Sequence, residues 1–163
     1  MLVVMDQFTR RLVGFGVHGG AVTGTDVCRL FNAAIHGQGA PRHLSTDHAP
    51  LFEAHRWRAN LRILEIDEIK TLPNVPLSHP FVERLIGTMR REFLDQVLFW
   101  NGRDLERKLA EFQVYYNAAR CHASLEGHRP MTFASGHAGP PADLRNVHWV
   151  SHCRDLVQLP IAA

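Results

Sequence analysis

Asp47 and Glu83 are the two side chains of this sequence that are best suited to hold a divalent cation. They are separated by 35 residues, and each lies next to a segment with a regular hydrophobic pattern. Asp47 ends the strand-like run 42–46, whereas Glu83 lies at the start of a segment with helical periodicity. Carboxylate oxygens are the ligands that hard cations such as Mg²⁺ prefer, and Mg²⁺ sites commonly act on phosphate substrates. The pair therefore predicts phosphodiester chemistry on nucleic acid.

Each member of the pair also has a simpler structural interpretation, which stays open. Asp47 lies three residues before Pro50, so its carboxylate is also suited to cap a turn. Glu83 lies at the border of the apolar stripe of its helix, which is compatible with an exposed position on an amphipathic helix. That stripe consists of Val82, Ile86, Met89 and Phe93.

Three arginines follow Glu83 on the same predicted helix, at Arg84, Arg90 and Arg91. Arg90 comes seven residues after Glu83, which returns it to within about 20° of the same helix face. Arginines placed in this way are suited to contact DNA phosphates. The alternative is a solvated face of mixed charge, because Arg91 is followed directly by Glu92.

The composition is that of an ordinary globular domain. The 163 residues are 45% hydrophobic and 21% charged, with a net charge of +2, so affinity for nucleic acid requires a local basic patch. The three cysteines contain no CxxC motif, which indicates neither a disulfide framework nor a cysteine-based zinc site. The cysteine usage also predicts a reducing, cytoplasmic location. No apolar run approaches 18 residues, so we expect no membrane partner.

The elements that must position these residues follow from hydrophobic periodicity and from glycine and proline. Gly14 and Gly16 are expected to loosen the first hairpin, and Pro73 and Pro76 to interrupt a loop before the helix that carries Glu83. The aromatic residues Trp57, Trp100, Tyr115 and Tyr116 are interpreted as packing residues. We predict a hairpin of 2–8 and 11–18, strands at 42–46 and 62–66, helices at 25–37, 50–59, 80–98 and 103–119, and an irregular tail from Cys121 with a late strand in 147–160. This order predicts a mixed α/β sheet with helices packed on it.

Four segments in this order resemble a known family. Val3–Phe15 looks like a vvDxfSRxivG hairpin, and Ser45–Phe52 looks like an sDnGxxF segment. His79–Glu92 looks like a naxxErfngtlKrE helix, and Tyr116–Pro130 looks like a YNxxRxHxsLxxxxP ending. Together they resemble the integrase catalytic core of bacterial insertion-sequence transposases and retroviral integrases.

The resemblance implies an α/β fold of the ribonuclease-H-like type, with a mixed sheet and flanking helices. In that family three carboxylates hold two Mg²⁺ or Mn²⁺ ions for DNA strand cleavage and strand transfer. Asp47 and Glu83 match the second and third carboxylates. Arg84, Arg90 and Arg91 would contact DNA, with Arg90 facing target or end DNA. The implied partners are transposon ends, target DNA and further copies of the chain, which places the protein at the nucleoid.

Two departures from the family pattern stand out. His48 and Ala49 occupy the place of the family's "nG", and His48 is a candidate for contact with phosphate. The family's first catalytic Asp lies on a strand that precedes the match, so we expect the first, central strand to be missing. Asp6 lies on the neighbouring strand and is a weaker candidate for that ligand. We expect a partial core over 1–130 and a tail over 131–163, arising from a misassigned start, a truncated element or a split transposase.

Two other functions compete with a DNA-joining enzyme that lacks one metal ligand. The first is a catalytically dead DNA-binding or oligomerisation remnant of a transposase. The second is an unrelated nuclease of the ribonuclease-H-like type, against which the transposase-like ending at 116–130 argues.

Overall fold

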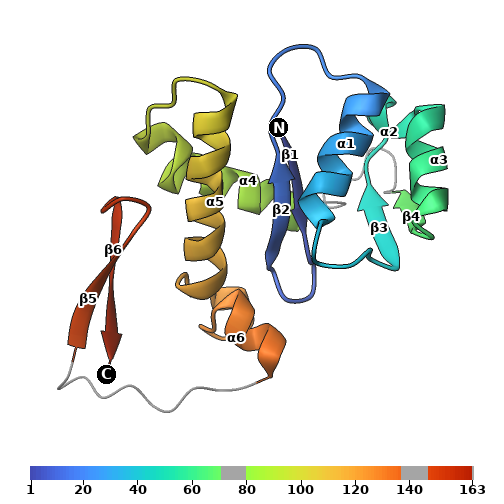
Figure 1. Cartoon of the computed structure of the whole chain (residues 1–163). Helices are drawn as coiled ribbons and strands as arrows, with labels where there is room; N and C mark the ends of the chain where they lie inside the picture. The colour runs from blue at the N-terminus through green and yellow to red at the C-terminus, as the bar shows by residue number, and fades with distance from the viewer. Residues whose placement is uncertain (71–79, 137–146, 163) are drawn as a thin grey trace. The chain divides into compact units, whose positions relative to one another are not determined.

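The computed structural model describes residues 1–70, 80–136 and 147–162 of the chain (Figure 1). The predicted loop with Pro73 and Pro76 lies outside these residues. The chain divides into two compact units, which we call unit 1 (Met1–Met5 and Val13–Ile86) and unit 2 (Asp6–Leu12 and Gly87–Ala163). No helix of the described part is long and apolar enough to cross a membrane.

The predicted hairpin is present, with shorter strands. β1 (Leu2–Met5) and β2 (Leu12–Gly16) form a two-stranded sheet. Gly14 of β2 is required by close packing, because a Cβ atom there would lie 2.0 Å from the carbonyl oxygen of Ala34. The expectation that glycine loosens this strand was therefore wrong, since glycine here lets a helix approach the strand backbone.

That helix is α1 (Gly24–Ile35), which confirms the prediction for 25–37 to within two residues. Thr23 and Asp26 form a capping box that satisfies the first free backbone N–H groups of α1. The buried face of α1 joins one hydrophobic cluster with side chains from the segment 57–66. The cluster consists of Val27, Phe31, Ile35, Trp57, Leu61 and Ile66.

The prediction of a helix at 50–59 and a strand at 62–66 was wrong in its boundaries. The structure has a short helix α2 (Pro50–Glu53), a helix α3 (His55–Ile63) and a strand β4 (Asp67–Lys70). Helix α3 ends in a Schellman motif, in which Ile66 N–H donates to Leu61 O and Glu65 N–H donates to Arg62 O. Glu65 takes a left-handed φ of 56° at this turn. Ile66 is therefore buried as part of a helix cap, where the sequence pattern had indicated a strand.

Strand β4 pairs in parallel with β3 (His43–Thr46), with Thr46 opposite Lys70. Its polar residues Glu68 and Lys70 are partly buried, whereas Ile69 between them is 53% exposed. This reversed alternation is why β4 has no hydrophobic signature in the sequence. The mixed α/β character is confirmed, but the described strands pair as three separate two-stranded sheets instead of one.

The helix that carries Glu83 is shorter than predicted. α4 spans Pro80–Glu92 and is followed by a 3₁₀ turn at Leu94–Gln96, where the periodicity had predicted helix up to 98. Its buried residues include Leu85, Thr88 and Met89, and Phe93 follows at 1% exposure.

Unit 2 is built on α5 (Gly102–Ala118), whose bounds agree with the prediction. The Phe112 ring packs against Phe93 at a centroid distance of 5.3 Å and against Tyr116 at 5.7 Å. The tail from Cys121 is more regular than predicted. It contains a 3₁₀ turn (Ala123–Leu125), α6 (Pro130–Ser135) and an antiparallel hairpin of β5 (Val147–His152) and β6 (Val157–Ala162).

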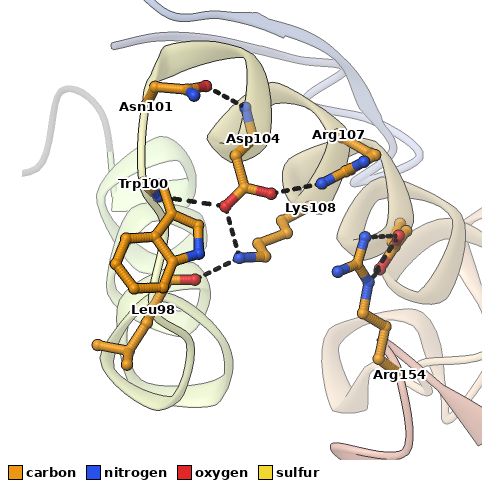
Figure 2. Close-up of polar contacts among 8 residues, drawn as sticks. Leu98, Trp100, Asn101, Asp104, Arg107, Lys108 and Arg154 are labelled. Carbon is orange, nitrogen blue, oxygen red and sulfur yellow. Dashed lines mark hydrogen bonds and ion pairs between the residues drawn. The ribbon is translucent and has the colours of Figure 1, made fainter.

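Trp100 is the one predicted packing residue that the structure contradicts. Its side chain is 87% exposed, whereas Trp57, Tyr115 and Tyr116 are buried. The reason is that α4 ends early, which leaves Leu98–Trp100 in a connection between helices. Figure 2 shows how this connection is held: the Trp100 N–H donates to Asp104, and the Lys108 ammonium donates to both Asp104 and the Leu98 carbonyl. These contacts order the backbone of 98–101 while the side chains stay in solvent.

Asn117 of α5 satisfies the backbone of Leu12 at the edge of β2. The Leu12 N–H donates to Asn117 Oδ1 at 2.9 Å, and Asn117 Nδ2 donates to Leu12 O at 2.9 Å. Gln113 adds a second donor to the same carbonyl at 3.1 Å. Because Leu12 and Asn117 are 1% and 8% exposed, water is not available to replace these bonds.

We predict that Asn117→Ala lowers the free energy of unfolding by about 2–4 kcal/mol, since it removes two hydrogen bonds and leaves a buried N–H without an acceptor. Gln113→Ala is the matched control, and we expect a loss of about 1 kcal/mol or less because Leu12 O keeps its bond to Asn117. Urea denaturation of both variants measures the difference. Equal losses would contradict the role given to Asn117.

His122 is a buried titratable group of unit 2. Its ring lies edge-on to Tyr116 at a centroid distance of 4.7 Å, and its Nδ1 is 3.5 Å from the Arg120 guanidinium. Arg120 is itself held by both carboxylate oxygens of Glu92. Burial is the main cause that lowers the pKa of His122 to about 4, and the charge of Arg120 adds to it.

Because the folded pKa of His122 is lowered from 6.5 to about 4, the unfolded chain binds the proton more readily than the folded chain in this window. We therefore predict that His122 contributes a loss of stability as the pH falls from 6.5 towards 4. His122→Gln should flatten the slope of unfolding free energy against pH in that window, whereas a change at the exposed His36 should leave the slope as it is. A slope that is unchanged in His122→Gln would contradict this account.

Candidate functional site

Asp47 lies directly after β3 and is exposed. Its Oδ1 accepts a hydrogen bond from the Ala49 N–H at 2.9 Å, and its carbonyl oxygen accepts one from Lys70 Nζ at 3.2 Å. The turn interpretation of Asp47 is therefore correct for one carboxylate oxygen. Among the described residues no hydrogen bond to the other oxygen, Oδ2, is present. The cap and a ligand role are thus compatible, because they use different oxygens.

Glu68 of β4 fixes the residue before Asp47. Its Oε1 accepts hydrogen bonds from Thr46 Oγ1 at 2.6 Å, from Trp57 Nε1 at 2.9 Å and from Lys70 Nζ at 3.0 Å. Burial raises the pKa of Glu68, but the hydrogen bonds from Thr46, Trp57 and Lys70 lower it more, so the pKa lies below its ordinary value. Glu68 therefore carries its charge at neutral pH and draws three donors to one point.

Glu53 at the end of α2 is a second carboxylate that pairs with Lys70. It forms ion pairs with Lys70 at 3.4 Å, with His48 Nδ1 at 3.7 Å and with Arg58. The hydrogen bond from Arg58 is the main cause that lowers the pKa of Glu53, and Lys70 adds to it. His48, which the sequence assigned to phosphate contact, thus has a carboxylate as its neighbour in the protein.

The other predicted site residues lie on α4. Glu83 and Arg84 are exposed in the part of α4 that belongs to unit 1, and Arg90 and Arg91 are exposed in the part that belongs to unit 2. The Arg91 guanidinium folds back towards Gly87, where a Cβ atom would lie 3.2 Å from it.

Asp6 is engaged in the turn between β1 and β2. Its Oδ1 accepts the Phe8 N–H at 2.9 Å and its Oδ2 accepts the Thr9 hydroxyl at 2.7 Å. Both oxygens are thus used to cap the turn, which weighs against Asp6 as the first metal ligand.

Glu68 and Lys70 were not among the predicted site residues, although Glu68 contacts Thr46 and Lys70 contacts Asp47. Residues two apart on a strand share a face, so their spacing was a usable signal. It was lost because the strand was predicted at 62–66, which left both residues in a loop.

The donor chemistry of Asp47 and Glu83 fits a hard divalent cation, since both offer exposed carboxylate oxygens. The described residues contain no group of three or more His, Cys, Asp or Glu side chains that could hold a metal ion. The fit therefore concerns only the type of ligand that each of the two side chains offers.

The sequence matches a protein family model and a protein of an insertion element. A family model described as an integrase core domain matches residues 65–130. The chain is 30% identical over 136 residues to the "Insertion element IS476 uncharacterized 39.2 kDa protein" of Xanthomonas euvesicatoria. That match covers 83% of this chain and 39% of that protein, so the chain spans well under half of its relative.

Solved structures share the fold at low sequence identity. A chain of the simian T-cell lymphotropic virus intasome has a TM-score of 0.67 at 19% identity, with 90% of this chain and 54% of that chain covered. The HTLV-2 integrase catalytic core domain in complex with magnesium has a TM-score of 0.59 at 18% identity, with 80% and 81% covered. The BIV integrase catalytic core domain has a TM-score of 0.59 at 20% identity, with 82% and 84% covered. Residues 65–130 therefore match the integrase core domain family, and the fold of the chain is that of an integrase catalytic core.

Proposed function

We propose that the chain serves DNA integration or transposition, and that Asp47 and Glu83 are two of the carboxylates that hold the divalent cations for DNA strand cleavage and strand transfer. The observation that carries this proposal is the position of the Asp47 carboxylate and the use of its two oxygens. Its carboxylate follows the carboxyl end of a parallel strand, where α/β folds commonly place functional groups, and only one of its oxygens is used to cap the turn. The integrase core match includes Glu83 and supports the same assignment.

Asp47 and Glu83 would hold Mg²⁺ or Mn²⁺, and the bound cation would neutralise charge at the reacting phosphate. The described residues contain no group of three such side chains, so they identify no third ligand. β1 and β3 each have one edge without a strand partner in the described part of unit 1, and such an edge can accept a further strand.

The absence of a three-membered group from the described residues also favours a second candidate function. In it the chain is a catalytically dead remnant that binds DNA or assembles with further copies of itself. The two candidates share the proposed DNA contacts and differ in the metal site. Metal binding and strand transfer, measured on the same protein, therefore distinguish them.

We propose DNA contacts on the surface of each unit, by His48 and Arg84 in unit 1 and by Arg90 and Arg91 in unit 2. The three arginines are exposed and suited to phosphate contact. His48 already lies 3.7 Å from Glu53, so contact with phosphate would compete with that carboxylate.

We predict that the chain binds Mn²⁺ weakly at Asp47 and Glu83, and that Asp47→Asn and Glu83→Gln each lower the Mn²⁺ affinity by about tenfold or more, since each removes a charged oxygen ligand. Asp67→Asn is the control, because Asp67 is an exposed carboxylate of the same unit, paired with His43. Electron paramagnetic resonance of free Mn²⁺ measures the affinity. Equal effects of all three variants would contradict the assignment, and Mn²⁺-dependent joining of DNA ends by this chain alone would show that the metal site is complete.

We predict that Arg90→Ala weakens binding to DNA of any sequence and reduces the slope of log affinity against log salt by about 0.9, the effect of one lost phosphate contact. Arg29→Ala on α1 is the control, because the Arg29 side chain is 78% exposed and is not one of the proposed DNA contacts. Fluorescence anisotropy at several salt concentrations gives both slopes. The role of Arg90 fails if its slope equals that of Arg29→Ala.

A further inference from the structure

The ammonium group of Lys70 lies among four oxygen atoms, which belong to α2, to β4 and to Asp47 directly after β3. It donates to the carbonyl oxygens of Asp47 at 3.2 Å and Phe52 at 3.1 Å. It also pairs with the carboxylates of Glu68 at 3.0 Å and Glu53 at 3.4 Å. β4 therefore reaches, through one side chain, the end of β3 and the end of α2.

This set of ligands is of the kind that proteins use for hard cations, namely two backbone carbonyls and two carboxylates. Here the position is taken by an ammonium group of the chain itself, at hydrogen-bond distances. The Lys70 side chain is 24% exposed, so its charge is partly desolvated and needs these partners. The two carboxylates are also satisfied by other groups, Glu53 by Arg58 and Glu68 by Trp57. The positive charges of Lys70 and Arg58 thus balance the negative charges of Glu53 and Glu68.

The contacts of Lys70 fix the segment that carries Asp47. One contact holds the Asp47 carbonyl, and another holds the Phe52 carbonyl five residues later. Between these points the Ala49 N–H donates to Asp47 Oδ1, and the Phe52 N–H donates to Ala49 O. With both ends of the segment held, Asp47 Oδ1 stays committed to the turn, and Oδ2 is the oxygen left for a ligand.

Glu68 links this clamp to the strand itself. The same oxygen that accepts from Lys70 also accepts from the hydroxyl of Thr46, the residue before Asp47. Thr46 is buried at 6% exposure, so its hydroxyl depends on Glu68. The backbone on the N-terminal side of Asp47 and the carbonyl of Asp47 are thus set by neighbouring side chains of one strand.

We propose that Lys70 is the positioning residue of the Asp47 site, in which its ammonium acts as a built-in cation that orders the segment 47–52 and orients the Asp47 carboxylate. The value of this order for catalysis rests on the proposed function of Asp47. The ordering of the segment 47–52 does not rest on that function, because it can be measured without DNA or metal.

The test is amide hydrogen exchange of the full chain, followed residue by residue by NMR. Lys70→Met keeps an unbranched apolar side chain but removes the ammonium. We expect at least tenfold faster exchange at the Ala49 and Phe52 amides, with no change at the Leu12 and Ala119 amides of unit 2. Lys108→Met is the matched control, since Lys108 likewise joins a carboxylate to a carbonyl, and it should leave Ala49 and Phe52 unchanged.

Chemical rescue separates positioning from general stability. Lys70→Ala removes three methylenes and the ammonium, so n-propylammonium is the matching probe, and we expect it to slow the Ala49 and Phe52 amides again. Tetramethylammonium carries the same charge without an N–H donor and should have no effect. Unchanged exchange at Ala49 in Lys70→Met would overturn the proposal. So would equal acceleration at all amides of unit 1, or equal rescue by both cations.

The Asp47→Asn measurement with Mn²⁺ keeps this proposal apart from the proposed function. Unchanged Mn²⁺ affinity in Asp47→Asn would contradict the metal role of Asp47. The amide result would still decide whether Lys70 orders the segment.

Discussion

The partly buried carboxylate of Glu68 is the constraint on which the site-bearing part of unit 1 depends. A charged group can leave water only if its oxygens are met by donors, and Glu68 meets this condition with Thr46, Trp57 and Lys70. These donors come from β3, α3 and β4. Satisfying a single charge thus fixes a strand end, a helix of the hydrophobic core and the lysine that holds the Asp47 loop.

Unit 2 uses the same chemistry for a different purpose. The carboxylate of Asp104 accepts from Lys108 and Arg107, and Lys108 also binds the carbonyl of Leu98 (Figure 2). The hydrogen bond from Lys108 is the main cause that lowers the pKa of Asp104, followed by the one from Arg107. In both units an ammonium joins a carboxylate to a backbone carbonyl, which orders a loop next to a helix. In unit 2 the ordered loop presents exposed apolar side chains, and in unit 1 it carries the carboxylate of Asp47.

Much of the fold was predictable because it follows from local patterns. The helices over 25–37 and 103–119 and the hairpin of β1 and β2 were all recognised from residues close together in the sequence. The errors arose where hydrophobic spacing does not decide the outcome. Ile66 is buried because it folds back on Leu61 in a helix cap, and β4 is a strand although its inward side chains are polar. Hydrophobic periodicity does not detect either case, because in both the buried group is defined by its partners.

The resemblance to integrase cores was recognisable without coordinates, because it rests on the order and spacing of short motifs around Asp47 and Glu83. The sequence by itself also determined which side chains offer hard oxygen ligands. Two further facts are visible only in the folded chain: one oxygen of Asp47 caps a turn, and Lys70, 23 positions later, holds its carbonyl. The reason is physical: a hydrogen bond needs a donor and an acceptor about 3 Å apart, and the parallel pairing of β3 with β4 is what brings them together.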